Sequence, residues 1–502
     1  MRKIYHPGRA MLLAAAAALL CSGPAAAQTT GNQPGASQPG GVVPASPAEQ
    51  PQGFWERPTM LGDAGGLRTA LAGHGVTVNL LESDEVQANL SGALKRGAAY
   101  DGLTTLTVQV DSAKAFGYDG GLFNISGLQI HGRNFSQYYL GVLQNASGIN
   151  TTPTTALWEA WYQQSFAEGS VDVRAGLQSI DQEFLISQNA ALFVNAMTGW
   201  PVVPSYGLYA SGPSYPLSSL GVRLRAKAGP FTALAGVFQD NPPGGPFAND
   251  GPTRGSSRFG GNFNLRTGAL AIAELQFAVN PGVARDTEIQ PNGQASNPQK
   301  DGAGDGGSSD ISSLPGVYKL GAYYDSASFP DQRYDYRGVS LASPASNRQA
   351  RLRRNNLALY AVADQMVWRK DAQSISLFGA VMGAPGDRNA VDFGLYAGAT
   401  WKGALPGRDD DTIGAVYGLA TLSSGARGLD RDAGLFTQPG YPVRSREHLI
   451  EVFYQVQITP WLQVQPDVQY IARPSGGVPD PNRAGRVLGD AVVVGVRTNI
   501  TF

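Results

Sequence analysis

The side chains best suited to chemistry are planar polar groups that recur at every second position of certain segments. In 171–178 and 220–228 they alternate with apolar residues, so they would share one face of a strand. The groups are Arg174, Arg223, Arg225, Glu451, Gln463, Gln465 and Asp467. Guanidinium, carboxamide and carboxylate groups can bridge neighbouring hydroxyls. Facing one aqueous space, they would hold a neutral, hydroxylated solute by weak contacts, although generic polar lining is the commoner role of any single one.

A second group of candidates lies in the stretch 181–205, "DQEFLISQNAALFVNAMTGWPVVPS". The alternation of 171–178 stops here, yet the stretch holds many apolar side chains that need to be buried. We expect it to fold inward against the wall formed by the strands and to narrow the enclosed space. The side chains offered to a solute would then be Asp181, Glu183, Phe184, Asn195 and Trp200. The alternative is a loop that caps the rim without touching solute.

No catalytic constellation is evident in the sequence. The histidines are scattered, at His6, His74, His131 and His448. The stretch "DGAGDGGSSD" supplies carboxylates but lacks the ligand spacing of a calcium loop, and it is more typical of a flexible polar loop. We therefore predict that the protein is not an enzyme and has no catalytic residue, metal site or cofactor.

The N-terminal part of the chain indicates export. Residues 1–27 combine basic residues, an apolar run and an A-x-A cleavage site, which is typical of a signal peptide. Its removal takes away Cys21, the only cysteine, and three positive charges with no negative ones, so the formal net charge changes from −1 to about −4. Thiol chemistry and nucleic-acid binding are therefore not expected. Residues 28–54 are predicted to be a disordered Pro/Gly-rich leader, 55–75 a short periplasmic helical segment, and 76–502 a transmembrane β-barrel.

From Val76 onward, about sixteen segments alternate apolar and polar residues, most clearly 448–458 and 461–471. They run to about nine to twelve residues, as tilted membrane strands require, whereas soluble strands usually have about five or six. Tight turns also alternate with long loops along the chain, except at about 281–314, where a turn is expected and a long polar segment stands. These features favour an all-β, antiparallel outer-membrane barrel of about sixteen strands over a soluble β-sandwich.

Two observations concern strand register. Phe502 ends the chain on the apolar face of 491–502, which is what outer-membrane assembly signals look like. In 78–90, strict alternation would turn Glu82 and Asp84 toward lipid unless a bulge intervenes. The sequence leaves this second register open.

A set of motifs occurs in a fixed order along residues 55–502. They include "GDAGGLRTALAGHGV", "RAGLQSIDQEF", "FVNAMTGWPVVPS", "GPSYPLSSLGVRLR", "PGVYKLGAYYD", "LYAVADQMVW", "RDDDTIGAVYGLA", "TPWLQVQPDVQYIARPSGG" and "DAVVVGVRTNITF". In this order they resemble the carbohydrate-selective porins of the OprB family. The resemblance implies a sixteen-stranded barrel in the outer membrane of a Gram-negative bacterium. The Gly- and Asp-rich segment at about 281–310 departs from the family pattern, which has a tight connection there.

The function that the resemblance implies is passive diffusion of carbohydrates, namely glucose-type monosaccharides and, by extension, oligosaccharides. One alternative is a general diffusion porin without sugar selectivity, and another is a non-conducting barrel whose loops bind a partner at the cell surface. A plugged, energy-coupled receptor is disfavoured because residues 28–75 are too few for a plug domain. The expected partners are small carbohydrates and outer-membrane lipid, and the sequence leaves monomer and homotrimer open.

Overall fold

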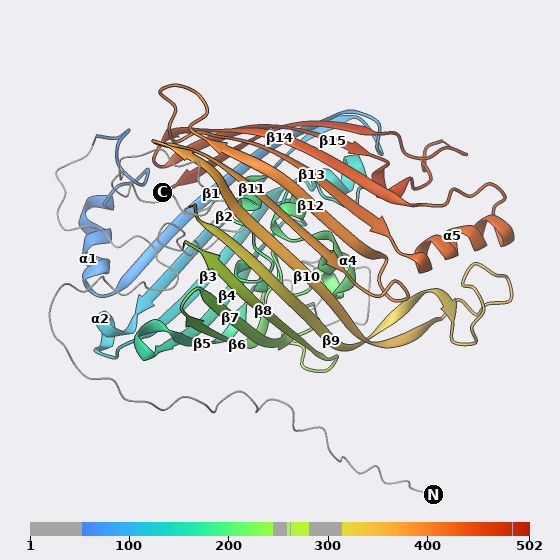
Figure 1. The fold of residues 1–502 in the computed structure, drawn as a ribbon, viewed down its shortest axis with the longest axis horizontal. Helices are drawn as coiled ribbons and strands as arrows, with labels where there is room; N and C mark the ends of the chain where they lie inside the picture. Colours follow the sequence, from blue (N-terminus) through green and yellow to red (C-terminus); the bar gives the residue numbers. More distant parts are fainter. Residues whose placement is uncertain (1–52, 244–258, 262, 281–313, 484) are drawn as a thin grey trace, which may run out of the picture. The chain divides into compact units, whose positions relative to one another are not determined.

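The computed structural model describes residues 53–243, 259–261, 263–280, 314–483 and 485–502, and these form a closed antiparallel barrel of sixteen strands (Figure 1). The strands are β1 (Val76–Ser91), β2 (Gly97–Asp111), β3 (Gly121–Gly132), β4 (Thr154–Phe166), β5 (Val171–Gln178), β6 (Ser219–Ala228), β7 (Phe231–Gln239), β8 (Ala269–Val279), β9 (Gly316–Asp335), β10 (Ala350–Lys370), β11 (Gln373–Gly383), β12 (Val391–Lys402), β13 (Thr412–Leu422), β14 (Arg446–Thr459), β15 (Leu462–Ala472) and β16 (Ala491–Thr501). Each pairs with its neighbours in sequence, and β1 pairs with β16 to close the ring. The predicted fold class is confirmed.

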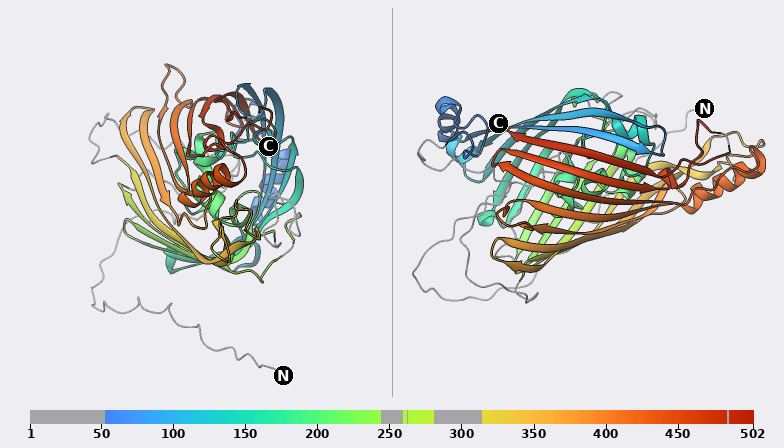
Figure 2. Two further views of the ribbon diagram at one scale, coloured as in Figure 1. Left: turned by 90° about the vertical axis from the view of Figure 1, so that its right-hand side faces the viewer. Right: turned by 90° about the horizontal axis from the view of Figure 1, so that it is seen from above.

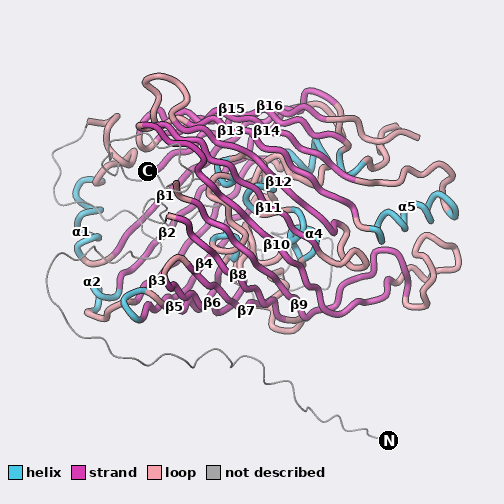
Figure 3. Tube along the Cα trace, viewed as in Figure 1, coloured by secondary structure: helices cyan, strands magenta, loops and turns pink. Residues whose placement is uncertain are grey.

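Alternation along each strand decides which side chains point out of the barrel. In β14, Ile450 and Val452 on the outer face are 49% and 47% exposed, whereas Glu451 between them is fully buried inside. A closed barrel satisfies every strand edge internally, so an apolar outer face can meet lipid without leaving backbone groups unpaired. Strands dominate the trace in Figure 3, and the helices among the described residues are short. None of these helices is long and apolar enough to cross a membrane.

The structure resolves the register that the sequence left open. Pairing of β1 with β2 runs without interruption from Val76 to Asn89, with Glu82 opposite Thr104 and Asp84 opposite Gly102. No bulge lies at either acidic residue, so both carboxylates are on the outer face of the wall.

The connections explain the break in the predicted pattern. β8 ends at Val279 and β9 begins at Gly316, so the strand count is correct and the expected turn is replaced by a long insertion, whose residues 281–313 lie outside the described part of the chain. β9 continues beyond the motif "PGVYKLGAYYD" as far as Asp335, β10 begins at Ala350, and helix α5 (Ser424–Phe436) interrupts the connection from β13 to β14. Local alternation did not indicate these extensions.

Helix α1 (Leu67–Gly73) confirms the predicted short helix, while the proposed signal peptide and residues 28–52 of the leader lie outside the described residues. The helix is placed at the closure of the barrel. Arg68 donates hydrogen bonds to the carbonyls of Val78 and Phe502, and the Met60 N–H donates to the Thr501 carbonyl at 2.8 Å. The N-terminal segment thus fastens β1 to the end of β16. Helix α2 (Ser112–Phe116) turns the chain between β2 and β3.

The interior is filled further than the predicted aqueous space narrowed by the stretch 181–205. The connections 133–153 and 179–218 fold into the ring, where the left view of Figure 2 shows helical turns of the second one in green. Their side chains pack against inward residues of the wall: Phe193 lies 4.7 Å from Phe453, and Phe184 lies 6.5 Å from Phe238, between ring centroids. Part of the lumen is therefore a packed core, because the loops bring apolar surface of their own that must be buried.

Candidate functional site

The connection from β5 to β6 supplies most of the site. It contains the short helices α3 (Ala196–Gly199) and α4 (Val202–Gly207), and it crosses the interior to reach strands on the far side. Phe184, Leu185, Val194 and Val203 are each at most 1% exposed. The predicted inward fold of 181–205 is thus what the structure shows.

Inward-facing carboxylates from four strands hold this loop in place. Glu159 accepts from Ser179 N (2.9 Å), Glu274 from Leu185 N (2.9 Å), Asp364 from Ser187 Oγ (2.7 Å), and Glu451 from Val194 N (2.8 Å) and Asn195 N (3.1 Å). A loop folded inside a barrel has backbone donors that no strand ladder satisfies, and each would be costly if left unpaired. The acidic wall residues therefore fix the path of the loop.

The connection from β3 to β4 is held in the same way by Glu447, four residues before Glu451 on β14. Glu447 accepts hydrogen bonds from Leu143 N (2.9 Å), Gln144 N (2.8 Å) and Ser475 N (2.6 Å). Glu447 and Glu451 lie on the same inward face of β14, and both are fully buried. One strand thus positions both inward loops relative to each other.

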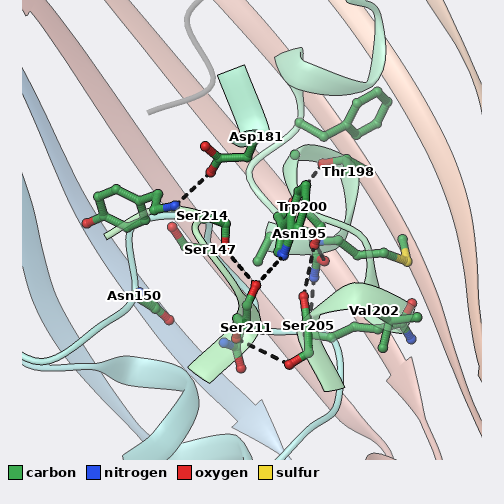
Figure 4. A pocket seen from close by; sticks show the side chains of 18 of the residues that line it. Ser147, Asn150, Asp181, Asn195, Thr198, Trp200, Val202, Ser205, Ser211 and Ser214 are labelled. Carbon is green, nitrogen blue, oxygen red and sulfur yellow. Dashed lines mark hydrogen bonds between the residues drawn. The ribbon is translucent and has the colours of Figure 1, made fainter. Parts of the chain in front are cut away.

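A cavity of about 300 Å³ lies between the two loops (Figure 4). Its lining includes Gln144, Ser147, Asn150, Asp181, Asn195, Thr198, Trp200, Ser205, Tyr206, Ser211, Ser214, Tyr215 and, from β16, Arg497. Trp200 is fixed by donation from Nε1 to the Ser211 carbonyl at 2.9 Å. Arg497 donates from Nε to Glu85 at 2.6 Å and contacts the Val194 carbonyl at 3.3 Å. The cavity therefore combines amides, hydroxyls, one guanidinium and aromatic rings.

Asp181 is held at the cavity wall by its neighbours. Its carboxylate accepts from Ser179 Oγ at 2.5 Å and from Tyr215 N at 2.8 Å. Burial raises the pKa of Asp181, and these hydrogen bonds oppose the shift. In the described part of the chain, no group of three metal-ligating side chains lines the cavity.

The predicted arginines form a buried ion-pair cluster beside the loop. Arg223 is completely buried between Asp172 and Glu183, to which it donates at 2.6 Å through Nη2. Arg225 donates to Asp172 at 2.7 Å, and the Arg174 guanidinium lies 3.8 Å from the centre of the Trp161 ring. Burial alone would raise the pKa of Glu183, but the surrounding guanidiniums outweigh it and hold that pKa at about 2.

The structure thus separates the sequence-predicted residues into groups. Asp181, Asn195 and Trp200 line the cavity. Those that lie outside its lining are Arg174, Glu183, Phe184, Arg223, Arg225, Glu451, Gln463, Gln465 and Asp467. Gln465 donates to the Leu192 carbonyl at 2.8 Å, so it holds the loop as Glu451 does. Gln463 instead forms hydrogen bonds with two other amide side chains of the wall, accepting one from Gln455 and donating one to Gln457.

Sequence reasoning missed the contribution of the β3–β4 connection. Gln144, Ser147 and Asn150 lie in the polar stretch "QNASGIN", whose loss of alternation matches that of 181–205. The alternation of the last strand could have identified Arg497 as an inward residue, because it faces away from Val496 and Thr498. Tyr206 and Tyr215 carry no local signal that distinguishes them from rim aromatics.

A sequence model described as "Carbohydrate-selective porin, OprB family" matches residues 95–502. The chain belongs to the OprB family. It is 26% identical over 491 residues to Porin B of Pseudomonas aeruginosa PAO1, covering 92% of this chain and 94% of that protein. Its fold is similar to the high-pH structure of Pseudomonas putida OprB, with a TM-score of 0.74 and 22% identity over 90% of this chain and 100% of the other.

Membership of the OprB family decides the general function. The chain is a carbohydrate porin of the Gram-negative outer membrane, a channel and not an enzyme. The inward loops and the wall carboxylates therefore lie inside the barrel of a sugar porin.

Proposed function

We propose that the cavity between the two inward loops is where this OprB-family porin contacts sugar and discriminates it from other small solutes. The observation that carries the proposal is the composition of the lining. Asn195 and Arg497 offer planar hydrogen-bonding groups, while Trp200 offers an aromatic face. A sugar is neutral, bears many hydroxyls and has apolar C–H faces, so this combination matches both of its surfaces.

The size of the cavity favours glucose-type monosaccharides. A volume of about 300 Å³ lies at the lower end of the range of about 300–1,000 Å³ found for small-molecule pockets. Most polar groups in the lining also have protein partners already, as Asp181 has in Ser179 and Tyr215. A sugar would exchange water for only a few new hydrogen bonds, so binding stays weak enough for release, as conduction requires.

In this proposal the remaining predicted residues act by positioning. Arg174 and Arg223 hold Glu183 at the start of the loop, Arg225 pairs with Asp172 beside them, and Glu451 and Gln465 hold the middle of the loop. The loop then forms a fixed constriction. The outer face of the strands, with side chains such as Ile450 and Val452, would contact outer-membrane lipid directly.

Proteoliposome swelling with glucose, a disaccharide and an uncharged oligoether of glucose size tests the proposal. Glucose should enter several times faster than the matched oligoether, and Trp200→Ala should remove that difference while leaving the barrel conductive. The matched control is Trp401→Ala, since Trp401 is 41% exposed on the outer face of β12 and should not affect selectivity.

Two outcomes would overturn the proposal. Equal entry of glucose and the oligoether would indicate a general diffusion porin. Unchanged glucose preference in Trp200→Ala would place the discrimination outside this cavity. The mass of the purified protein in detergent, measured in parallel, distinguishes a monomer from a homotrimer.

A further inference from the structure

A compact polar cluster lies on the outer face of the barrel wall, across β1, β2 and β3. It consists of Glu82, Asp84, Tyr100, Thr104, Gln129 and His131. Antiparallel pairing aligns Glu82 with Thr104 and Asp84 with Gly102, and it aligns Gly102 with His131. Glu82 and Asp84 on β1 thus meet His131 on β3 only because the three strands are adjacent in the folded wall.

The surroundings of the cluster are apolar. Val86, Leu106 and Ile125, on the same outer face, are 56%, 46% and 58% exposed. Arg or Lys on the lipid face of such a barrel costs about 2–4 kcal/mol near the midplane, and acidic residues cost less but still destabilise it. Two carboxylates side by side at this place therefore call for a compensating positive charge.

Three groups in the cluster are arranged as metal ligands. One ligand atom each of Glu82, Asp84 and His131 lies within 4.8 Å of the other two. His131 Nε2 is 3.6 Å from Glu82 Oε1 and 3.7 Å from Asp84 Oδ1. Ligands at 2.0–2.1 Å around a tetrahedral zinc ion are about 3.3 Å apart, so small rotamer adjustments would bring these atoms into coordination.

Gln129 sets the orientation of the His131 imidazole through its second ring nitrogen, Nδ1. His131 Nδ1 lies 2.9 Å from Gln129 Oε1, so it donates its proton there and leaves Nε2 directed at the two carboxylates. A ligand histidine almost always has such a partner on its second nitrogen, which fixes both its tautomer and its ring orientation. Thr104 does the same for Glu82, donating to Oε2 at 2.5 Å.

The space at the centre of the cluster exists because residue 102 is a glycine. A Cβ at Gly102 would lie 2.3 Å from His131 Nε2 and 2.8 Å from Asp84 Oδ1. The Tyr100 hydroxyl borders the same space, 2.8 Å from Nε2 and 2.5 Å from Asp84 Oδ1. A fourth ligand position is therefore available to that hydroxyl oxygen or to a water.

We propose that Glu82, Asp84 and His131 form a binding site for a divalent transition-metal cation, of which zinc is the test ion, on the outer wall of the barrel. One nitrogen and two carboxylate oxygens are a ligand set that zinc accepts. The bound ion neutralises both carboxylates and ties β1 to β3 across β2, next to the closure with β16. The site is separate from the sugar cavity and does not depend on the proposed role of that cavity.

Zinc binding to the full-length protein in detergent, stripped with a chelator, tests the proposal. Calorimetric titration should give one zinc ion per chain, and Co²⁺ should give visible absorption bands of a low-coordinate site with imidazole ligation. His131→Ala and Glu82→Gln should each weaken binding at least tenfold. Gly102→Ala, which retains all three ligands but fills the space between them, should weaken it similarly.

The chain offers a matched control in His448, which faces outward with its Nδ1 2.7 Å from the Tyr417 hydroxyl. Within the described residues it belongs to no group of three metal-ligating side chains. His448→Ala should bind zinc as the unsubstituted protein does. Heat-modifiable migration on gels confirms that each variant has a folded barrel, and Glu82→Gln remains informative if His131→Ala does not fold. The proposal would be overturned if the unsubstituted protein bound no zinc. It would also be overturned if His448→Ala lost zinc binding to the same extent as His131→Ala.

Discussion

Replacing Glu447 by glutamine should release one inward loop and leave the other in place. Glu447 Oε2 accepts from Leu143 N at 2.9 Å and from Ser475 N at 2.6 Å, while Oε1 accepts from Gln144 N at 2.8 Å. A carboxamide keeps one acceptor oxygen and places an NH₂ donor where the other oxygen was. At least one buried backbone N–H then faces a donor, and the charge that strengthened the remaining bonds is lost.

The magnitude follows from the number of bonds. A hydrogen bond to a charged group contributes about 1.5–3 kcal/mol. Where the amide NH₂ takes the place of Oε2, the bonds from Leu143 N and Ser475 N are both lost, which costs about 3 kcal/mol if each contributes about 1.5 kcal/mol. Since about 1.4 kcal/mol corresponds to a factor of ten, the open population of the loop should rise roughly 100-fold.

Hydrogen–deuterium exchange of the protein in detergent measures this opening. Glu447→Gln should accelerate exchange at Leu143, Gln144 and Ser475. The reciprocal control is Glu451→Gln on the same strand, which should accelerate exchange at 194–195 and not at 143–144. Unchanged protection at 143–144 in Glu447→Gln, with an intact barrel, would refute the anchoring role. Uniform acceleration across the strands would show general destabilisation and would refute it equally.

Two further predictions concern charge and backbone conformation. Glu183 has its pKa lowered from 4.5 to about 2, so its ion pairs stabilise the fold fully at neutral pH, and about 3 kcal/mol is lost as pH falls from 4.5 through 2. Glu183→Gln should therefore unfold at a lower temperature at pH 7, and its unfolding temperature should not show this acid-dependent loss. Equal slopes of unfolding temperature against pH for both proteins would contradict the lowered pKa of Glu183. At Gly92, with φ +60°, a Cβ would lie 2.0 Å from the Asp490 carbonyl oxygen, whereas Gly117, with φ +73°, has nothing within 4 Å of that position. Gly92→Ala should lower the unfolding temperature clearly more than Gly117→Ala, and similar values for the two would show that the close approach is unimportant.

Much of the wall could be predicted from sequence because strand alternation is a local property. The outer-face run of Val492, Val494 and Val496 predicts a lipid-facing strand without knowledge of any partner. The same period places Glu451 and Arg497 inside. Loss of the period in 181–205, together with its apolar content, was sufficient to predict that this loop turns inward.

The roles of individual residues could be predicted from the sequence less well than the wall. Arg223 has the pattern of a residue lining an aqueous lumen, but in the structure it is fully buried by Asp172 and Glu183. Whether an inward group meets solute or protein depends on which loop covers it. That is decided by contacts between residues far apart in the chain, such as Val194 with Glu451, and no local period records them.

The sequence by itself determined that this protein is a barrel, which face of most strands points outward, and that the β5–β6 loop enters the interior. Only the tertiary structure decided that two loops enclose the cavity, that inward carboxylates hold the loops instead of lining the path, and that Glu82, Asp84 and His131 converge on the outer wall. The physical reason is that alternation fixes the side to which a residue points, whereas ring closure and strand register fix the neighbours that it meets there.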